Sequence, residues 1–492
     1  MAQEIQGEIR GSELNTVIFS GILIICRVSF STVKILSEFI KKRIHRLSPG
    51  QGLLFYYSLA ILLGGILLSL PIAVNGEPLS FLDALFTATS AQCVTGLAVV
   101  DTGSRLSLFG QLVVLFLIQA GGLGITTFSV YLFSYMGTRF SLHSRKLIEE
   151  TLLPFPYASI KDLIRGIFIL TFIIEAIGMA LLAIRFVPDL GWGKGLYSAM
   201  FHSISAFCNA GFSLFPNSME SYRGDPIVNL TLMFLIITGG LGFLVLQEIL
   251  GMTKRKKGRR HRFSLHSRLV LITSLILTVG GAVLLGVLEN SSELHQLSST
   301  EGFWTMLFQS VSARTAGFNS LDLNLLEVPS LFLIMALMFV GASPGSCGGG
   351  IKTTSLALLF VILTSLFRGE RSTNIFRRTI PSERIARVLT LVLLSLLVCG
   401  MAVFALLIVQ TSGLPANAQH GAFIAYSFEA VSAFATVGLS LGVTPTLAPA
   451  GKLIIIVLMF IGRVGILTLA FAFIRRARRT PVIYGQEQIM IG

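Results

Sequence analysis

The sequence predicts an all-α membrane protein assembled from four similar units. Its composition is too apolar for a water-soluble globule, because 53% of the residues are hydrophobic, only 13% are charged and the mean hydropathy is +0.79. Long apolar runs recur along the whole chain, and one short phrase that ends in glycine occurs four times. Together these observations favour several membrane-spanning helices arranged in a repeated pattern.

The apolar runs are long enough to cross a bilayer, since each reaches or exceeds the ~20 residues that a spanning helix needs. They fall at residues 52–74, 107–135, 163–186, 227–250, 267–288, 328–367, 386–411 and 451–474. This spacing predicts two spanning helices in each of the four units.

The repeated phrase begins with phenylalanine and closes on glycine followed by Leu or Phe. Its copies are residues 86–97 (FTATSAQCVTGL), 201–212 (FHSISAFCNAGF), 308–318 (FQSVSARTAGF) and 428–439 (FEAVSAFATVGL). The third copy is one residue shorter between its Ser-Ala pair and its glycine. A period of roughly 100 to 120 residues is too long for a solenoid and suits a whole structural unit repeated four times. The four loops therefore predict a ring built from a single chain.

Each phrase follows a helix that is too short to cross the membrane. In the first and third units this helix is expected at 80–92 and 301–313, about half the length that ~30 Å of hydrocarbon demands. A short helix between two crossings is re-entrant, and irregular backbone after it is tolerated only where it lines a water-filled path. We therefore expect four pseudo-symmetric helix, pore-loop, helix repeats around one central ion pore.

The expected units follow one another without long linkers. Residues 16–38 form a further apolar stretch without a cleavage pattern, which favours a retained membrane-associated or interfacial helix over a signal peptide. The divisions are an N-terminal membrane-associated segment at 1–48, repeat 1 at 49–138, repeat 2 at 139–252, repeat 3 with a broken second helix at 253–370, and repeat 4 with a short cytoplasmic tail at 371–492.

The charge pattern predicts the orientation in the membrane. Basic residues gather in alternate loops, at 41–46, 145–146, 254–262, 368–387 and 475–479, and acidic residues occupy the loops between them. By the positive-inside rule both termini are cytoplasmic, the four phrases face outward, and the protein is expected in the plasma membrane. The net charge of +14 does not predict a nucleic-acid partner, because the basic residues form no stripe on a soluble domain. The five cysteines lack metal-ligand or CxxC spacing and are interpreted as small apolar residues.

The third repeat contains an interruption that we interpret as a gate. From Pro329 to Phe367 there are about 39 residues, nearly 60 Å of helix, yet only one crossing fits between the outer Glu327 and the inner Arg368. Residues 341–350 (GASPGSCGGG) hold five glycines and a proline and cannot persist as helix. The predicted gate residues are Gly345, Ser346, Cys347, Gly348, Gly349, Gly350, Lys352 and Arg463.

The phrases contain no carboxylate at their glycine ends, so backbone carbonyls must supply any cation ligands. This chemistry suits a dehydrated monovalent cation better than a divalent one, which prefers anionic oxygens. The alternative is that each glycine merely ends its short helix, but four corresponding glycines favour a selectivity filter. The predicted K⁺ ligands are Val94, Thr95, Gly96, Asn209, Ala210, Gly211, Thr315, Ala316, Gly317, Thr436, Val437 and Gly438.

Two cations are expected at membrane depth. Arg463 stands in the middle of the last apolar run, where a charge costs roughly 2.5 to 3.5 kcal/mol, and Lys352 follows the interruption. They either oppose cation passage until the interruption moves or have a structural role. The candidate structural partners are Glu175, Gln119, Gln247 and loop carbonyls. Arg314, beside the third phrase, is expected to brace it by bonding carbonyls or Glu429.

Taken together, these residues resemble the Trk/Ktr/HKT superfamily of potassium transporters over about residues 50 to 475. The resemblance rests on the four phrases, the glycine-rich interruption before Lys352 and the arginine at 463. It implies K⁺ uptake, a homodimer with one pore per protomer, and a cytosolic ring of nucleotide-binding regulatory subunits on the basic face. No covalently bound cofactor is implied for this chain, and the nucleotide belongs to the partner.

The resemblance also bears on selectivity and subfamily. In that superfamily glycine at all four filter positions goes with K⁺ selectivity and serine at the first goes with Na⁺ preference, so Gly96 favours K⁺. Many Trk members carry two extra spans before the first repeat and Ktr members none, whereas this chain has about one candidate, so the subfamily stays open.

Two other classes are weighed against this interpretation. A sodium-coupled small-solute symporter would also have broken helices, but it would show two inverted halves rather than four similar loops. A membrane-embedded enzyme would need a nucleophile or metal cluster at depth, and the sequence shows no such pattern. Passive conduction and H⁺ or Na⁺ coupling are both compatible with the sequence.

Overall fold

A computed structural model describes residues 49–138, 160–253, 263–289, 298–370, 372–412, 416–466 and 468–469. The chain divides into two compact units, residues 1–53 and 54–492, and only residues 49–53 of the first are described. The predicted N-terminal segment at 1–48, the loop clusters at 145–146 and 254–262, and the C-terminal tail lie outside the described residues.

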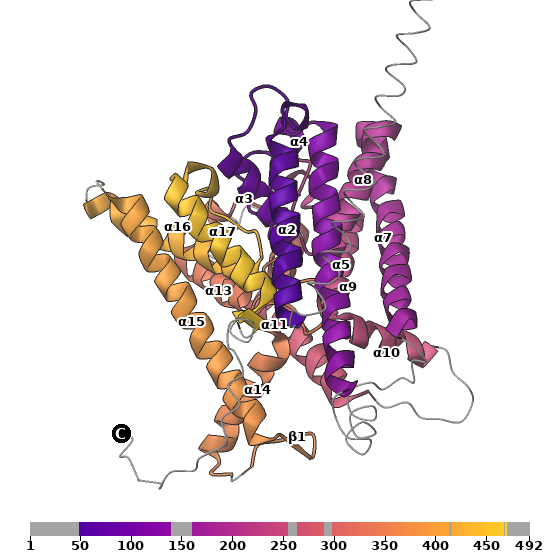
Figure 1. The fold of residues 1–492 in the computed structure, drawn as a ribbon, viewed down its shortest axis with the longest axis vertical. Coiled ribbons are helices and arrows are strands. Elements are labelled where there is room, and N and C mark those ends of the chain that lie inside the picture. The colour runs from indigo at the N-terminus through magenta and orange to yellow at the C-terminus, as the bar shows by residue number, and fades with distance from the viewer. Residues whose placement is uncertain are drawn as a thin grey trace, which may run out of the picture. The chain divides into compact units, whose positions relative to one another are not determined.

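The described chain is mostly helical (Figure 1). Its α-helices are α2 Pro49–Ser69, α3 Phe81–Gln92, α4 Thr102–Arg105, α5 Leu108–Thr138, α7 Ile160–Leu190, α8 Trp192–Phe207, α9 Pro226–Leu241, α10 Phe243–Thr253, α11 Leu265–Leu288, α12 Ser299–Ser312, α13 Val328–Phe339, α14 Thr353–Phe367, α15 Ser382–Thr411, α16 Ala416–Ala435 and α17 Pro449–Val464.

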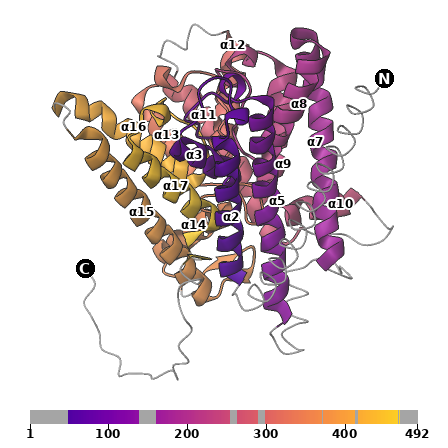
Figure 2. The ribbon, with the colours of Figure 1, turned by 45° about the horizontal axis from the view of Figure 1, so that its top comes forward.

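The order of these helices repeats along the chain. A long helix (α2, α7, α11, α15) precedes a shorter one (α3, α8, α12, α16), which ends at a glycine phrase, and a further helix (α5, α9, α13, α17) follows. The third kind of helix packs against the shorter helix of the next unit, in the pairs α5 with α8, α9 with α12, α13 with α16 and α17 with α3 (Figure 1, Figure 2). Because the last pair returns to the first unit, these contacts form a closed circle.

The long helices confirm the first expected span of each unit. Among the described residues, four helices are long and apolar enough to cross a membrane: Gly50–Ser69, Ile164–Leu190, Leu265–Leu288 and Ser382–Thr411. Only 22% to 33% of the most apolar window of each is buried, so most of their side chains face outward, as lipid-facing helices require.

The second expected spans are more irregular than predicted. The run at 227–250 was expected to be continuous, but α9 and α10 are bent by 103° at Gly242. The final run at 451–474 likewise leaves its helix at Gly465. Both glycines have positive φ, 88° and 87°, a conformation in which an L side chain is strained. A continuous spanning helix at either place is therefore a wrong prediction.

A second short repeat lies near these bends and also occurs inside helix α5, which continues through it. The sequences GGLG at 121–124, GGLG at 239–242 and GRVG at 462–465 occupy corresponding positions in repeats 1, 2 and 4. The first glycine of each lies against the main-chain oxygen of a residue near the end of its own short helix, so closely that an added Cβ would come within 3.0 Å of it. These pairs are Gly121 with Gln92, Gly239 with Phe207 and Gly462 with Phe434.

In the third repeat the corresponding helix is interrupted where the glycine-rich sequence predicts it. Helix α13 ends at Phe339 and α14 begins at Thr353, and Gly345 and Gly350 between them have φ of 73° and 65°. The all-α prediction is incomplete at one place outside the spans. Strands β1 Asn374–Ile375 and β2 Arg378–Thr379 form a hairpin whose two turn residues both have positive φ, as a type I′ turn requires.

The close approach at Gly239 generates a stability prediction. Gly239→Ala places a methyl group against the Phe207 carbonyl, and we expect a loss of about 1–3 kcal/mol from overpacking. The thermal unfolding midpoint in detergent measures this. Gly280→Ala is the matched control, because an added Cβ at Gly280 meets nothing within 4 Å. This substitution also replaces a flexible glycine of helix α11 by a residue with less conformational freedom in the unfolded chain. Equal midpoints for the two variants would contradict the packing role of Gly239.

Candidate functional site

The four glycine phrases share an unusual backbone conformation. Each has positive φ at its glycine and at the residue two positions earlier. The pairs are Val94 and Gly96 (57° and 94°), Asn209 and Gly211 (60° and 69°), Thr315 and Gly317 (72° and 78°), and Thr436 and Gly438 (51° and 95°). Positive φ is strained for Val and Thr, which points to a functional backbone geometry. Left-handed residues at this spacing let successive carbonyls face a common axis.

A buried serine fastens each phrase to itself. The serine is the fifth residue of every copy and is hydrogen-bonded either to the amide of the phrase's glycine or to the carbonyl of the residue after it. These bonds run from Gly96 N to Ser90 Oγ (3.1 Å), from Ser205 Oγ to Phe212 O (2.8 Å), from Ser312 Oγ to Phe318 O (2.6 Å) and from Gly438 N to Ser432 Oγ (3.0 Å). The sequence prediction missed this role, although the serine recurs in all four copies.

The shorter third phrase keeps the same closing contact. In the other copies the amide before the glycine donates to the serine carbonyl five residues earlier, as Thr95 N does to Ser90 O at 2.8 Å. In the third copy Ala316 N donates to Ser312 O, four residues earlier, at 2.9 Å. The missing residue is therefore absorbed in the turn, and the third glycine keeps its place.

The structure brings all four phrases together. Each glycine lies so close to a main-chain oxygen of the next phrase that an added Cβ would come within 3.0 Å of that oxygen. The contacts join Gly96 to Ala210 O, Gly211 to Ala316 O, Gly317 to Val437 O and Gly438 to Thr95 O. The last contact returns to the first phrase, so the glycines and carbonyls form a closed ring in which no larger residue fits.

The interrupted segment of repeat 3 lies against this ring. An added Cβ on Gly348 would meet Thr315 Oγ1, and one on Gly349 would meet Thr436 Oγ1, each within 3.0 Å. The segment is also hydrogen-bonded to repeat 2 on both sides of the bend at 242. These bonds run from Ser343 N to Gly240 O (3.0 Å), from Cys347 N to Gly239 O (3.1 Å) and from Phe243 N to Gly345 O (3.1 Å).

Both intramembrane cations bind carbonyls of this segment. Lys352 Nζ donates to Gly348 O at 2.7 Å. The buried guanidinium of Arg463 donates to the Cys347 carbonyl and to Gly121 O, the latter at 2.6 Å. Of the structural partners that the sequence offered for Arg463, the loop carbonyls are therefore the ones observed. Both positive charges therefore lie at the interrupted segment.

Tyr57 was missed by the sequence prediction. Its buried hydroxyl donates to Gly121 O at 2.9 Å and accepts from Arg463 Nε at 3.3 Å. A tyrosine inside an apolar run was the only available signal. Of the partners expected for Arg314, carbonyls or Glu429, a carbonyl is the one observed, and it belongs to helix α11. The acceptors of Arg314 are Ser274 O (2.9 Å), Thr278 Oγ1 (2.9 Å) and Ser274 Oγ (3.1 Å).

Comparison with known proteins identifies the family. Residues 55–478 match the family model TrkH, described as a cation transport protein. The chain belongs to the TrkH family. This is a family of transporters. The match confirms the resemblance to the Trk/Ktr/HKT superfamily.

Individual members and relatives of the TrkH family are similar to this chain over most of its length. The Ktr system potassium uptake protein B of Bacillus subtilis is 41% identical over 450 residues, which cover 91% of this chain and 97% of that protein. The potassium/sodium uptake protein NtpJ of Enterococcus hirae is 38% identical over 458 residues, 92% and 99% of the two chains. The crystal structure of the potassium transporter TrkH from Vibrio parahaemolyticus matches with a TM-score of 0.69 at 18% identity, covering 87% and 86%, which shows the shared fold.

Two phrases of this TrkH-family chain carry a further brace that the sequence prediction missed. The second residue of the phrase contacts the serine 11 positions later, with His202 Nε2 at 3.0 Å from Ser213 Oγ and Ser440 Oγ donating to Glu429 Oε2 at 2.8 Å. The serine directly after both phrases was the available signal. The first and third phrases have Thr87 and Gln309 instead of His or Glu at this position.

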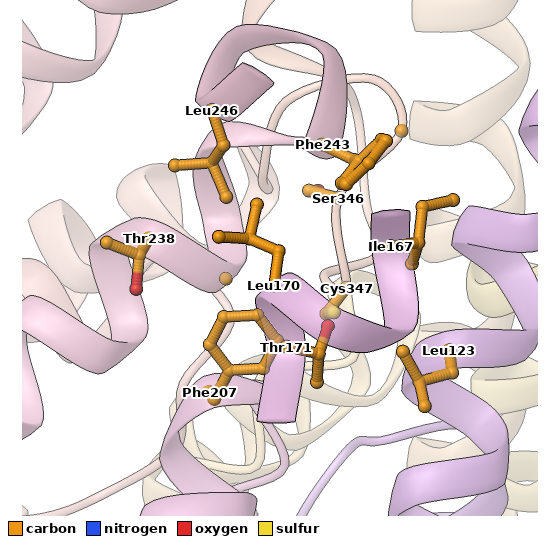
Figure 3. A pocket seen from close by; sticks show the side chains of 12 residues that line it. Leu123, Ile167, Leu170, Thr171, Phe207, Thr238, Phe243, Leu246, Ser346 and Cys347 are labelled. Atoms are coloured by element: carbon orange, nitrogen blue, oxygen red, sulfur yellow. The ribbon is translucent and has the colours of Figure 1, made fainter. Parts of the chain in front are cut away.

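A small, mostly apolar cavity borders the interrupted segment (Figure 3). Helices α5, α7, α8, α9 and α10 contribute to its wall together with the segment itself. The lining residues are Leu123, Ile167, Leu170, Thr171, Phe207, Thr238, Gly239, Phe243, Leu246, Gly345, Ser346 and Cys347. One side of the segment therefore faces space that protein atoms do not fill.

Tyr57→Phe tests the buried bond network at Arg463. We expect a loss of about 1–3 kcal/mol, because the variant leaves the buried Arg463 Nε without its acceptor and removes one of the two donors to Gly121 O. The measurement is the thermal unfolding midpoint in detergent. Tyr56→Phe is the control, since Tyr56 is the neighbouring residue, donates to Ala120 O at 3.0 Å and is 40% exposed. A control variant as unstable as Tyr57→Phe would argue against the network.

Proposed function

We propose that this chain mediates potassium uptake across the cytoplasmic membrane through one central pore formed by its four repeats. The observation that carries the proposal is the closed ring in which each phrase glycine meets a carbonyl of the next phrase. The names of relatives over 35% identical, which include Ktr system potassium uptake proteins of Bacillus subtilis and Vibrio alginolyticus, support potassium as the transported ion. The repeats are assigned to residues 49–138, 139–252, 253–370 and 371–492.

The ring is assigned as the selectivity filter. Its oxygens are main-chain carbonyls, so they replace the hydration shell of a monovalent cation without adding fixed negative charge. The left-handed residues and the serine bonds hold the carbonyls in one arrangement before the ion arrives. The assigned residues are Val94, Thr95, Gly96, Asn209, Ala210, Gly211, Thr315, Ala316, Gly317, Thr436, Val437 and Gly438.

The segment from Gly345 to Gly350, with Lys352 and Arg463, is assigned as the gate. Its contacts with Thr315 and Thr436 support this, because a loop against the filter obstructs passage until it moves. The two cations bind carbonyls of this segment and add electrostatic repulsion to the obstruction. Its bonds to both sides of the bend at 242 couple the loop to helix α10, which leads to the basic loop at 254–262.

The assembly is proposed from the family and the charge pattern. The basic loops and both termini face the cytoplasm, where a ring of nucleotide-binding regulatory subunits binds, and two copies of the chain form a homodimer in the plasma membrane. A sodium-coupled small-solute symporter is the rival function. The circle of four contacts between successive units favours the pore, since symporters are built from two inverted halves.

Ion flux into liposomes separates these functions. Protein reconstituted with an imposed gradient is expected to take up K⁺ and Rb⁺ faster than Na⁺, and uptake of an organic solute without Rb⁺ movement would establish the symporter instead. Flux with and without an imposed proton or sodium gradient distinguishes passive conduction from coupled transport.

Gly96→Ser tests the filter. A Cβ at Gly96 cannot be accommodated beside Ala210 O without displacing the ring, so we expect the K⁺ over Na⁺ flux ratio to fall about tenfold, equivalent to ~1.4 kcal/mol of discrimination. Gly280→Ser is the control because open space surrounds that helical position. An unchanged flux ratio in Gly96→Ser would remove the filter assignment.

Arg463→Gln tests the gate together with deletion of residues 345–350. Both changes remove contacts that hold the loop in place, so K⁺ flux without a regulatory partner should rise several-fold. Arg463→Lys should give an intermediate rate, because an ammonium cannot reproduce the divergent guanidinium bonds. Arg185→Gln is the control, since Arg185 pairs with Asp225 away from the loop. Wild-type rates in both gate variants would refute the assignment.

A further inference from the structure

One acidic side chain lies at membrane depth without an ion-pair partner among the described residues. Glu175 is at the middle of helix α7, and it is the only charged residue between Arg165 and Arg185. Glu175 is 5% exposed, so its side chain faces the protein interior rather than lipid. An ionisable residue in a spanning helix is costly to insert and by default indicates a functional site.

The carboxyl group of Glu175 is only half satisfied. Gln119 Nε2 donates to Oε2 at 3.2 Å, whereas Oε1 has no hydrogen-bond partner among the described residues. The ion pairs found in the described part of the chain involve other residues. A buried carboxylate oxygen without a donor or cation is strongly unfavourable when charged. A proton bound to the group removes this cost.

A chain of side chains connects Glu175 to the gate. Gln119 Oε1 accepts a hydrogen bond from Cys208 Sγ at 3.4 Å, and the Cys208 thiol lies beside that of Cys347. The Cys347 carbonyl is in turn held by Arg463. Figure 3 shows Cys347 facing the same cavity as Thr171, which precedes Glu175 by one turn of α7. The turn of α7 that carries Thr171 therefore lines the same cavity as the gate segment.

The surroundings of Glu175 favour a proton over a divalent cation. Divalent cations prefer several anionic oxygen ligands, and no group of three or more His, Cys, Asp or Glu that could hold a metal is found among the described residues. The side chain that bonds the carboxyl group is the neutral Gln119 of α5, and Ser203 of α8 donates to the main-chain carbonyl of Glu175. A proton on the unpartnered Oε1 would neutralise the carboxyl group.

We propose that Glu175 is a proton-binding site whose occupancy biases the gate segment, an inference that rests on the proposed function. The titratable and charged groups on the gate side are the thiols of Cys208 and Cys347 and the cations Lys352 and Arg463. The ionised carboxylate offsets the positive potential of the two cations, and this interaction is strong in a low-dielectric interior. Protonation removes that offset, so acidification reduces potassium flux.

The test is ⁸⁶Rb⁺ flux into liposomes that contain the full chain, measured over a series of pH values equal on both sides. Wild-type flux should fall about fivefold or more as the pH is lowered from alkaline to neutral, because burial favours protonation of Glu175 already in this range; fivefold is the lower end of ordinary coupling between two sites. Glu175→Gln should give a low, pH-independent flux because it imitates the protonated form, and Glu175→Asp should restore a pH response. Glu301→Gln, at the start of helix α12, is the control and should keep the wild-type profile.

A second measurement keeps the inference testable if a variant transports poorly. Infrared difference spectra between neutral and alkaline pH should show a protonated carboxyl band that wild-type protein loses on alkalinisation and that is absent in Glu175→Gln. A wild-type pH profile in Glu175→Gln, or an unchanged carboxyl band, would overturn the inference. Absence of Rb⁺ flux in the wild type at every pH would instead refute the proposed function, so the two failures are distinguishable.

Discussion

The structure depends on the close approach of four glycines to four main-chain oxygens. Each contact leaves no space for a β-carbon, and each joins one repeat to the next. The serine bonds shape the individual phrases, while the packing of α5, α9, α13 and α17 on the neighbouring short helices brings the phrases into register. Local backbone geometry and long-range packing therefore favour the same ring, which is the consistency expected of a well-determined site.

The sequence was informative about the ring because the information is local and repeated. Four copies of one phrase identify the glycines, and the apolar runs identify the long helices, including Ile164–Leu190 and Ser382–Thr411. The interruption in repeat 3 is also readable, since glycine and proline there cannot sustain a helix. The bends at Gly242 and Gly465 were missed, because a single glycine inside an apolar run is compatible with both straight and bent helix.

Side-chain partners were the least predictable part of the site. Arg314 bonds Ser274 on helix α11, the long helix of the same repeat, rather than Glu429. Which acceptor Arg314 meets depends on how segments distant in the sequence pack. Tyr57 and Gln119 are visible in the sequence only as polar residues inside apolar runs, and their partners are determined by the neighbours they acquire on folding. Spacing therefore predicts which backbone segments meet, whereas the hydrogen-bond network among them requires coordinates.

The side-chain contacts of His202 and Glu429 are present in two of the four phrases, and this difference affects how the sequence of the ring can change. Because one polypeptide supplies the whole ring, a substitution alters a single quadrant, whereas in an assembly of four identical subunits it would alter all of them. Here the His202 and Glu429 contacts occur in the second and fourth phrases, which are opposite in the cycle, so adjacent phrases differ in this contact. A substitution in one phrase can therefore change one quarter of the ring and leave the other three unchanged.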